Sequence, residues 1–375
     1  MINVQTIQFT QGAPAYTFDT TGFTLNISGA GISNTSAPPL NYATFTQNGA
    51  GALNFFGSAN ASSFTFDPNS VGLTPFFAGT HITNIGAGLT GFFGTSTAGF
   101  AYIQNLNGGT TAFTDQSNAG SATIITDNNN NPIVGSLTFF FQNSNAGNAT
   151  IANQHFGGTV FQNSSSAGSA FITNDSGGAT FFQDQAKAGT ANITNGPAGK
   201  TEFFISSSAD QATITNFGIT RFHDQSNAGN ATIINKSGGD LEFLDQSTGH
   251  KMNIFNDPGG NVFFAATANS DGPTIINSTI TNSGNVYFRD ESTAGLARLI
   301  NNAGGVIDIS GLTNAGMSAG SVEGAGTVFL GSKRLTVGGN NFSTEVSGRF
   351  SDGGVAGGVG GTLVKVGRDA DPVGQ

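Results

Sequence analysis

The chain has 375 residues and a formal net charge of −10, from 22 acidic and 12 basic side chains, and only 9% of its residues are charged. The acidic balance disfavours nucleic acid or an anionic membrane as the main partner, and the absence of Cys excludes disulfides and thiol chemistry. Its 34 Phe residues beside 56 Gly residues indicate a packed protein, and no run of about 18 apolar residues predicts a transmembrane helix.

Residues 1–90 have this composition without a clear repeat frame. Aromatic pairs such as Phe55-Phe56 and Phe76-Phe77 are separated by irregular stretches that contain Gly and Ser. We interpret this segment as irregular coils of the repeat that follows. Its first residues have neither a basic segment nor an apolar segment of the kind found in secretory signals, so we expect no signal peptide in this chain.

Residues 91–310 repeat one line of sequence, for example FHDQSNAGNATIIN at 222–235. The copies align on the Gly of an Ala-Gly pair, with a mean period near 22 residues and three consecutive steps of 21. The aligned positions are Gly99, Gly120, Gly147, Gly168, Gly189, Asp210, Gly229, Gly249, Gly272 and Gly295.

Three columns of residues keep fixed distances from this Gly. An aromatic column lies seven residues before it: Phe92, Phe113, Phe140, Phe161, Phe182, Phe203, Phe222 and Phe288, with Phe243 and Phe264 displaced by one. An aliphatic column lies four residues after it: Ile103, Ile124, Ile151, Ile172, Ile193, Ile214, Ile233, Ile276 and Leu299. Two residues further on stands Asn105, Asn153, Asn174, Asn195, Asn216, Asn235 or Asn301. The alternation of period two around these columns is typical of β-strands.

A unit of about 22 residues cannot bury its own apolar face, but stacked units can. The sequence therefore predicts an all-β fold, a parallel β-helix solenoid with about 21–22 residues per coil, in which like residues form ladders along the axis. Gly and Asn would occupy corners that need positive φ, and Asn side chains would bond to the next Asn along the ladder. A β-propeller is disfavoured because its repeats are about 40 residues long.

The end of the chain differs from the regular repeat. Residues 311–367 are rich in Gly and Val and predict further short strands, which we interpret as terminal coils. Residues 368–375 are polar and are expected to be frayed.

Two parts of the sequence resemble the passenger region of Gram-negative autotransporters, with their autotransporter-associated β-strand repeats. They are the repeat FxDxSxAGxAxIxN and the segment that runs from SVEGAGTVFLGSKRLTVGGNN to GGTLVKVG. The resemblance implies a right-handed parallel β-helix, a location at the cell surface or outside the cell, and a role in adhesion, aggregation or display. It also implies a signal peptide and an outer-membrane β-barrel translocator. Neither is recognised in this sequence, so we expect the chain to be a fragment of such a protein.

Asp residues near the aromatic column offer the best case for chemistry, because β-helices resemble polysaccharide lyases and hydrolases that use clustered carboxylates beside basic groups. Asp224 and Asp245 lie in consecutive copies, with Arg221 and His223 close by in sequence. The Asp column recurs in other copies, which favours a ladder of turn residues over an active site; a cation-binding edge is the remaining alternative. Arg221 and His223 differ from the residues at the same positions of other copies. Together with Asp224 and Asp245 they form the candidate local surface site.

The sequence shows no recognisable catalytic, cofactor-binding or metal-binding set. It therefore predicts a non-enzymatic β-helical passenger fragment that acts in adhesion or aggregation or as a structural stalk. A carbohydrate-active β-helix enzyme is the alternative. The expected partners are a polysaccharide, a host or abiotic surface, or copies of the chain itself, and no nucleic acid. A groove with one non-repeating cluster of carboxylates and basic groups would favour the enzyme, whereas uniform faces would favour the scaffold.

Overall fold

The computed structural model describes residues 1–10, 13–34, 43–64, 79–129, 135–265, 274–275 and 278–367. Gly272 and Ile276, two members of the expected columns, lie outside the described residues, as do Phe76-Phe77 and the expected frayed tail. The chain divides into two compact units, Met1–Ile193 and Thr194–Gln375. Both units are parallel β-solenoids, so the all-β prediction is confirmed.

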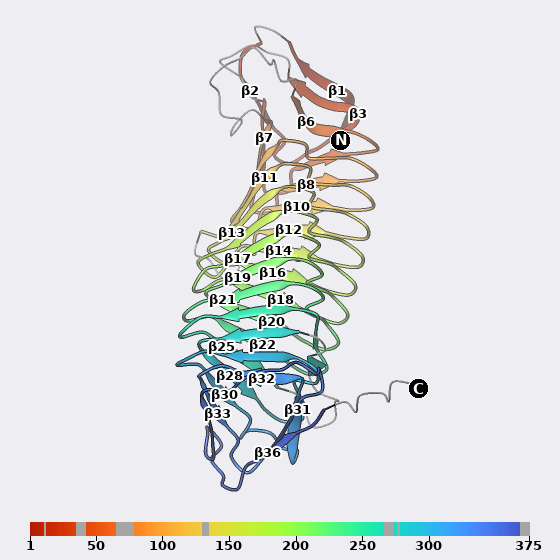
Figure 1. Cartoon of the computed structure of the whole chain (residues 1–375). Coiled ribbons are helices and arrows are strands. Elements are labelled where there is room, and N and C mark those ends of the chain that lie inside the picture. Colours follow the sequence, from red (N-terminus) through yellow and green to blue (C-terminus); the bar gives the residue numbers. More distant parts are fainter. Residues whose placement is uncertain are drawn as a thin grey trace, which may run out of the picture. The chain divides into compact units, whose positions relative to one another are not determined.

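The first unit contains two sheets whose strands pair in parallel with the equivalent strand of the next coil (Figure 1). One sheet contains β1 (Ile2–Phe9), β3 (Thr24–Asn34), β5 (Ala52–Phe55), β8 (Leu89–Phe92), β10 (Thr110–Phe113), β12 (Leu137–Phe140), β14 (Gly158–Phe161) and β16 (Ala179–Phe182). The other contains β2 (Tyr16–Asp19), β4 (Ala43–Asn48), β7 (His81–Ile85), β9 (Tyr102–Leu106), β11 (Thr123–Asp127), β13 (Thr150–Gln154) and β15 (Phe171–Asn174). The short strand β6 (Asn60–Phe64) pairs with β3, and β17 (Asn192–Asn195) contains the division between the units.

The second unit has the same arrangement. Its first sheet contains β18 (Lys200–Phe203), β20 (Ile219–Phe222), β22 (Asp240–Phe243), β25 (Asn261–Phe264), β28 (Asn285–Phe288), β30 (Val306–Asp308), β33 (Thr327–Phe329) and β35 (Arg349–Ser351). Its second sheet contains β19 (Thr213–Asn216), β21 (Thr232–Asn235), β24 (Asn253–Asn256), β27 (Thr279–Asn282), β29 (Arg298–Asn301) and β32 (Ser321–Glu323). Further parallel pairs join β23 (Thr248–His250) to β26 (Thr274–Ile275), and β31 (Gly316–Ala319) through β34 (Arg334–Val337) to β36 (Thr362–Lys365).

One coil of the first unit shows how residues with positive φ form three corners and so divide the coil into three sides. The strand β9 ends at a corner where Asn107 and Gly108 have φ of 52° and 98°, and β10 follows. Asp115 (φ 59°) and Gly120 (φ 62°) form the other two corners. Asn118 lies between these corners and forms single bridges to the coils on either side. Left-handed backbone is least costly for Gly and is tolerated by Asn and Asp, so the predicted corner chemistry is confirmed.

The core of each unit contains the predicted Phe column as a stack of rings. In the first unit, ring centroids from Phe55 to Phe182 are 4.6–4.9 Å apart and neighbouring planes differ by 4–9°. In the second, the values from Phe203 to Phe288 are 4.6–4.9 Å and 3–14°. Identical residues in register must stack at the strand spacing, so the edge-to-face geometry common in other cores is excluded.

Three details of the predicted frame are wrong. Phe243 and Phe264 are not displaced, because both pair in register with their neighbours. The corner assigned to Gly249 belongs to His250, which has φ of 49°. The column position assigned to Ile276 is held by Ile280, which pairs with Ile254. Gly249 precedes the true corner by one residue, and an insertion separates Ile254 from Ile280, whereas strand pairing depends on which side chains face inward.

Candidate functional site

The corner Asp residues form a ladder of side-chain-to-backbone hydrogen bonds. Asp224 and Asp245 have φ of 54° and 55°. The amide of Ile205 donates to Asp224 Oδ2 at 2.9 Å, and the Asp224 amide donates to Asp245 Oδ2 at 3.2 Å. In the first unit the amide of Gly94 donates to Asp115 Oδ2 in the same way. The carboxylates satisfy the amide of a neighbouring corner, which supports the structural reading of this column.

Arg221 belongs to the outer face of the first sheet and is held by ion pairs. Its Nε donates to Glu242 Oε2 at 2.7 Å, its Nη2 lies 3.2 Å from Glu242 Oε1, and its Nη1 lies 3.8 Å from Glu202. The hydrogen bond to Glu242, with the charges of Glu242, Glu202 and Asp240, raises the pKa of the Arg221 guanidinium above its usual value. The charges of Glu202, Arg221 and Glu242 thus alternate in sign on three consecutive strands of the sheet, and each pair is worth about 0–1 kcal/mol at this exposure.

His223 stacks flat on Phe204, with ring centroids 4.5 Å apart and planes 5° apart. Its Nε2 is buried and has no hydrogen-bond partner within the described parts of the chain. The structure thus brings Asp224 and Asp245 together through one hydrogen bond, while Arg221 bonds Glu242 and His223 packs on an aromatic ring. The four residues remain a proposed surface site, spread over a sheet face and a corner.

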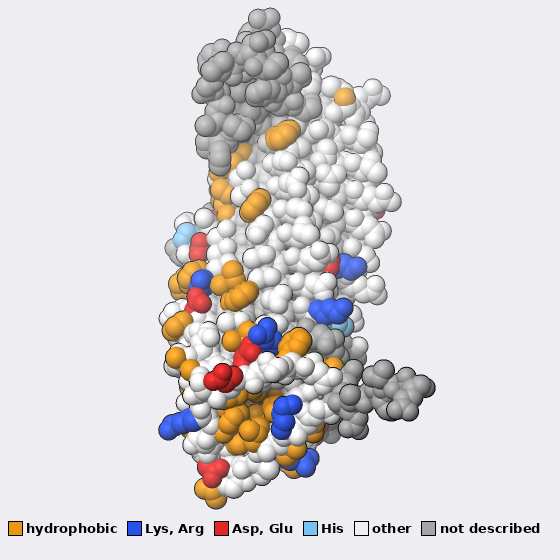
Figure 2. All heavy atoms as spheres, in the orientation of Figure 1, with side chains coloured by type: hydrophobic (Ala, Val, Ile, Leu, Met, Phe, Trp, Pro, Cys, Tyr) orange, Lys and Arg blue, Asp and Glu red, His pale blue; other side chains and the backbone are white. Residues whose placement is uncertain are grey.

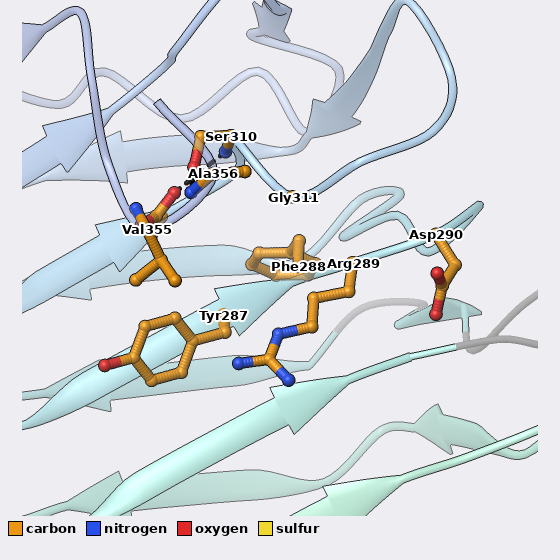
Figure 3. Close-up of a pocket in the computed structure, with 9 residues that line it drawn as sticks. Tyr287, Phe288, Arg289, Asp290, Ser310, Gly311, Val355 and Ala356 are labelled. Carbon is orange, nitrogen blue, oxygen red and sulfur yellow. Dashed lines mark hydrogen bonds between the residues drawn. The ribbon is translucent and has the colours of Figure 1, made fainter. Parts of the chain in front are cut away.

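A second candidate was not identified from the sequence. A pocket of about 150 Å³ lies on the outer face of the second unit, where β28 and β30 meet the loop 352–361 (Figure 3). Its lining includes Tyr287 and Arg289 from the end of β28, Asp308 and Ser310 from β30 and the residues after it, and Val355 from the loop. Tyr287 and Arg289 flank the core residue Phe288, so their outward direction follows from the alternation of the strand.

The loop of this pocket is held by hydrogen bonds from its backbone. The Val355 amide donates to Asp308 Oδ2 at 2.7 Å, and the Ala356 amide donates to Ser310 Oγ at 3.0 Å. Asp308 Oδ1 also accepts from the Ser310 amide at 2.8 Å. A Cβ at Gly354 would lie 2.6 Å from both Asp308 Oδ1 and Ser310 Oγ, so only Gly allows this close approach.

Comparison with known proteins gives a structural likeness and no sequence match. Neither the protein-family models nor the curated proteins include a match to this sequence. Among solved structures, the crystal structure of the TibC-catalysed hyper-glycosylated TibA55-350 fragment is similar over 98% of this chain and 97% of that chain, with 13% sequence identity and a TM-score of 0.30. The parallel β-solenoid itself rests on the strand pairing within each unit.

The residues that the structure describes include no helix with the length and apolar character needed to span a membrane. They also contain no group of three or more His, Cys, Asp or Glu side chains placed to hold a metal ion.

Proposed function

We propose that this chain is a non-enzymatic β-helical passenger fragment of an autotransporter, which acts at the cell surface in adhesion or aggregation or as a stalk. The repetition of neutral polar side chains on the outer faces, coil after coil, is the observation that supports this role. In the first unit Thr123 pairs with Thr150, and in the second Thr213 pairs with Thr232. Figure 2 shows that neutral polar side chains and backbone dominate the visible surface, while charged and hydrophobic side chains gather over the C-terminal coils.

Equivalent side chains at the spacing of the strands can each make one weak contact with a surface. Contacts on one rigid scaffold add through effective concentration, so many weak contacts together give firm attachment without a deep pocket. The likeness of the sequence to autotransporter passengers supports a location at the cell surface or outside the cell. The proposed partners are a polysaccharide, a host or abiotic surface, or another copy of the chain.

Attachment of coated beads tests this role. Latex beads would be covered with the purified chain at a series of densities and applied to polysaccharide-coated and bare glass under flow. We expect the retained fraction to rise steeply with coating density, because attachment requires many simultaneous contacts. Retention no greater than that of albumin-coated beads, on every surface and between the beads themselves, would rule the role out.

The carbohydrate-active enzyme is tested by turnover. The purified chain and its Asp224→Asn variant would be incubated with a panel of acidic and neutral polysaccharides, and new reducing ends or unsaturated products would be measured. We expect no products from either protein. Products from the unchanged chain that disappear in the variant would replace the scaffold role with an enzymatic one.

A further inference from the structure

The pocket lined by Tyr287, Arg289, Asp308, Ser310 and Val355, called here the Tyr287 pocket, lies at the end of a row of aromatic rings on the outer face. Phe263 and Tyr287 lie on the outer face of β25 and β28, with ring centroids 5.1 Å apart and planes 12° apart. On the next coil the position in register with Tyr287 is Asp308. Asp308 is 3% exposed, and its carboxylate accepts from the backbone of Ser310 and of the loop, so the aromatic row does not continue at this position. The pocket of about 150 Å³ is lined by Tyr287 and Asp308 together with Val355 of the loop (Figure 3).

Three polar groups of different chemistry border the same space. The Arg289 guanidinium carbon lies 4.9 Å from the Phe263 ring centroid and 5.5 Å from that of Tyr287, so the two rings hold it beside the pocket. Within the described residues its guanidinium forms no ion pair, unlike that of Arg221. The Ser310 hydroxyl accepts from Ala356 and retains its own proton to donate. Asp308 accepts one backbone amide at each oxygen, and each oxygen has a further lone pair.

We propose that the Tyr287 pocket binds one hexopyranose residue of a neutral glycan. A pyranose ring has a face of C–H groups that packs on an aromatic ring, and hydroxyls at its rim that both donate and accept. Here Tyr287 supplies the aromatic face, Arg289 and Ser310 supply donors, and Asp308 supplies an acceptor. The inference deepens the proposed surface-contact function and rests on it, because it names the class of surface molecule.

Charge and polarity favour a neutral sugar over other ligands. Arg289 is balanced by the carboxylates of Asp290 and Asp308, which also line the pocket, so an anionic sugar would meet a carboxylate as well as the guanidinium. An aromatic peptide side chain would fill the volume but leave the polar groups without partners, at a cost in free energy. A neutral pyranose satisfies both the apolar face and the polar rim.

Ligand-observed saturation-transfer NMR on the whole chain tests the pocket. The probes are the methyl glycosides of α-D-glucopyranose, α-D-mannopyranose and β-D-galactopyranose, with N-acetyl-tyrosinamide as the aromatic peptide probe. We expect transfer to at least one glycoside, strongest at its ring C–H protons. Transfer to N-acetyl-tyrosinamide alone would assign the pocket to a peptide and overturn the proposal, and so would transfer to none of the probes.

Two variants and one matched control locate the binding. Tyr287→Ala removes the aromatic face and Arg289→Gln removes the guanidinium, and each is expected to weaken glycoside binding about five-fold or more. Phe93→Ala is the control, because Phe93 stacks on Phe56 on the outside of the first unit with centroids 4.9 Å apart. Far-UV circular dichroism checks that each variant is folded. If Tyr287→Ala does not fold, the Arg289→Gln variant, whose change is at an exposed residue, tests the proposal by itself. Equal binding by the folded variants and the unchanged chain would overturn the proposal.

The bead experiment separates this inference from the proposed function. Firm attachment of beads together with no glycoside binding would reject the pocket and leave the surface role intact. Glycoside binding that Tyr287→Ala abolishes, together with no bead attachment, would reject the adhesive role and leave the pocket.

Discussion

The most consequential polar residues of this protein are inside the coils. In the first unit, an inward Asn of the second sheet accepts from a Thr hydroxyl of its own coil, as in the coils of Asn84, Asn105 and Asn153. Thr111 Oγ1 donates to Asn105 Oδ1 at 2.8 Å, and Asn84 Nδ2 donates to the same oxygen at 2.8 Å. Further along the second unit the ladder is formed by Asn side chains alone, because apolar residues such as Leu241 and Val262 occupy the Thr position. Each Asn there donates to the Asn of the next coil, in the order Asn216, Asn235, Asn256, Asn282 and Asn301. These Asn side chains are buried and hydrogen-bonded, so neutral polar contacts inside the coils help to specify the fold.

A second inward column contains Ser, whose hydroxyls behave differently. The Oγ atoms of these Ser residues are buried and have no hydrogen-bond partner within the described chain: Ser96, Ser117, Ser144, Ser165, Ser207, Ser226, Ser247 and Ser292. We infer that this position requires a small side chain and not a hydroxyl, because the buried Ala186 occupies it in one coil.

Two substitutions in one coil compare the contributions of the Asn–Thr column and the Ser column to stability. Thr111→Val keeps the shape but leaves the Asn105 oxygen without its hydroxyl donor, and we expect it to lower the free energy of unfolding by about 1–3 kcal/mol. Ser117→Ala removes a hydroxyl that has no partner, so we expect no loss or a gain of about 1 kcal/mol. Urea titration followed by circular dichroism measures both. A larger loss for Ser117→Ala than for Thr111→Val would show that the Ser column has partners the coil does not reveal.

Single strands of this protein are as short as two residues, in β26, and depend on neighbouring coils. The loop 352–361 is held by Asp308 and Ser310 and also by the carboxylate of Asp352. Hydrogen bonds from the amides of Gly360 and Gly361 lower the pKa of Asp352 below its usual value of 3.8. A lowered pKa means that the folded loop favours the charged carboxylate, so its contribution is present above the usual pKa and is lost as pH falls through the folded pKa.

Amide exchange of the loop should therefore depend on acidity. We expect Gly360 and Gly361 to lose protection relative to their intrinsic exchange rates as pH falls below about 4, while amides of the neighbouring strand β34 keep theirs. The Asp352→Asn variant should show low protection at every pH. NMR hydrogen exchange between pH 3 and 7 measures this, and protection of both glycines that stays constant over the range would contradict the assigned role of Asp352.

At the scale of the whole molecule, each coil contacts only its neighbours within a unit, so stability is the sum of coil and interface contributions. Phe140 illustrates this, because its ring lies 4.7 Å from Phe113 and 4.6 Å from Phe161. Loss of one ring leaves a cavity between two others and weakens both interfaces.

Phe140→Ala should destabilise the first unit locally. We expect a loss of about 3–5 kcal/mol, concentrated in the coils that contain Phe113 and Phe161 and weaker toward Phe55. Hydrogen–deuterium exchange with mass spectrometry measures the distribution, and Phe243→Ala in the second unit provides the matched change. Equal loss of protection along the entire chain would show one cooperative unit in place of nearest-neighbour coils.

The columns, the strands and the corners were predictable from the sequence because each follows from local chemistry. Inward Phe and Ile alternate with outward polar residues, and Gly, Asp or Asn stands at most positions of positive φ, so the repeat specifies the parallel β-solenoid. Some glycines needed the structure: Gly178 has ordinary φ, and a Cβ there would lie 2.1 Å from the backbone oxygen of Asn153 in the preceding coil.

The tertiary structure alone decided register and the candidate pocket. Register after an insertion depends on which residue of one coil meets which of the next, and Ile280 takes its column position by pairing with Ile254. The pocket unites Tyr287 with Val355, residues 68 positions apart in the sequence, because the loop 352–361 folds back onto Asp308. A repeat determines what each coil looks like; contacts between residues distant in the chain determine where one coil differs from the rest.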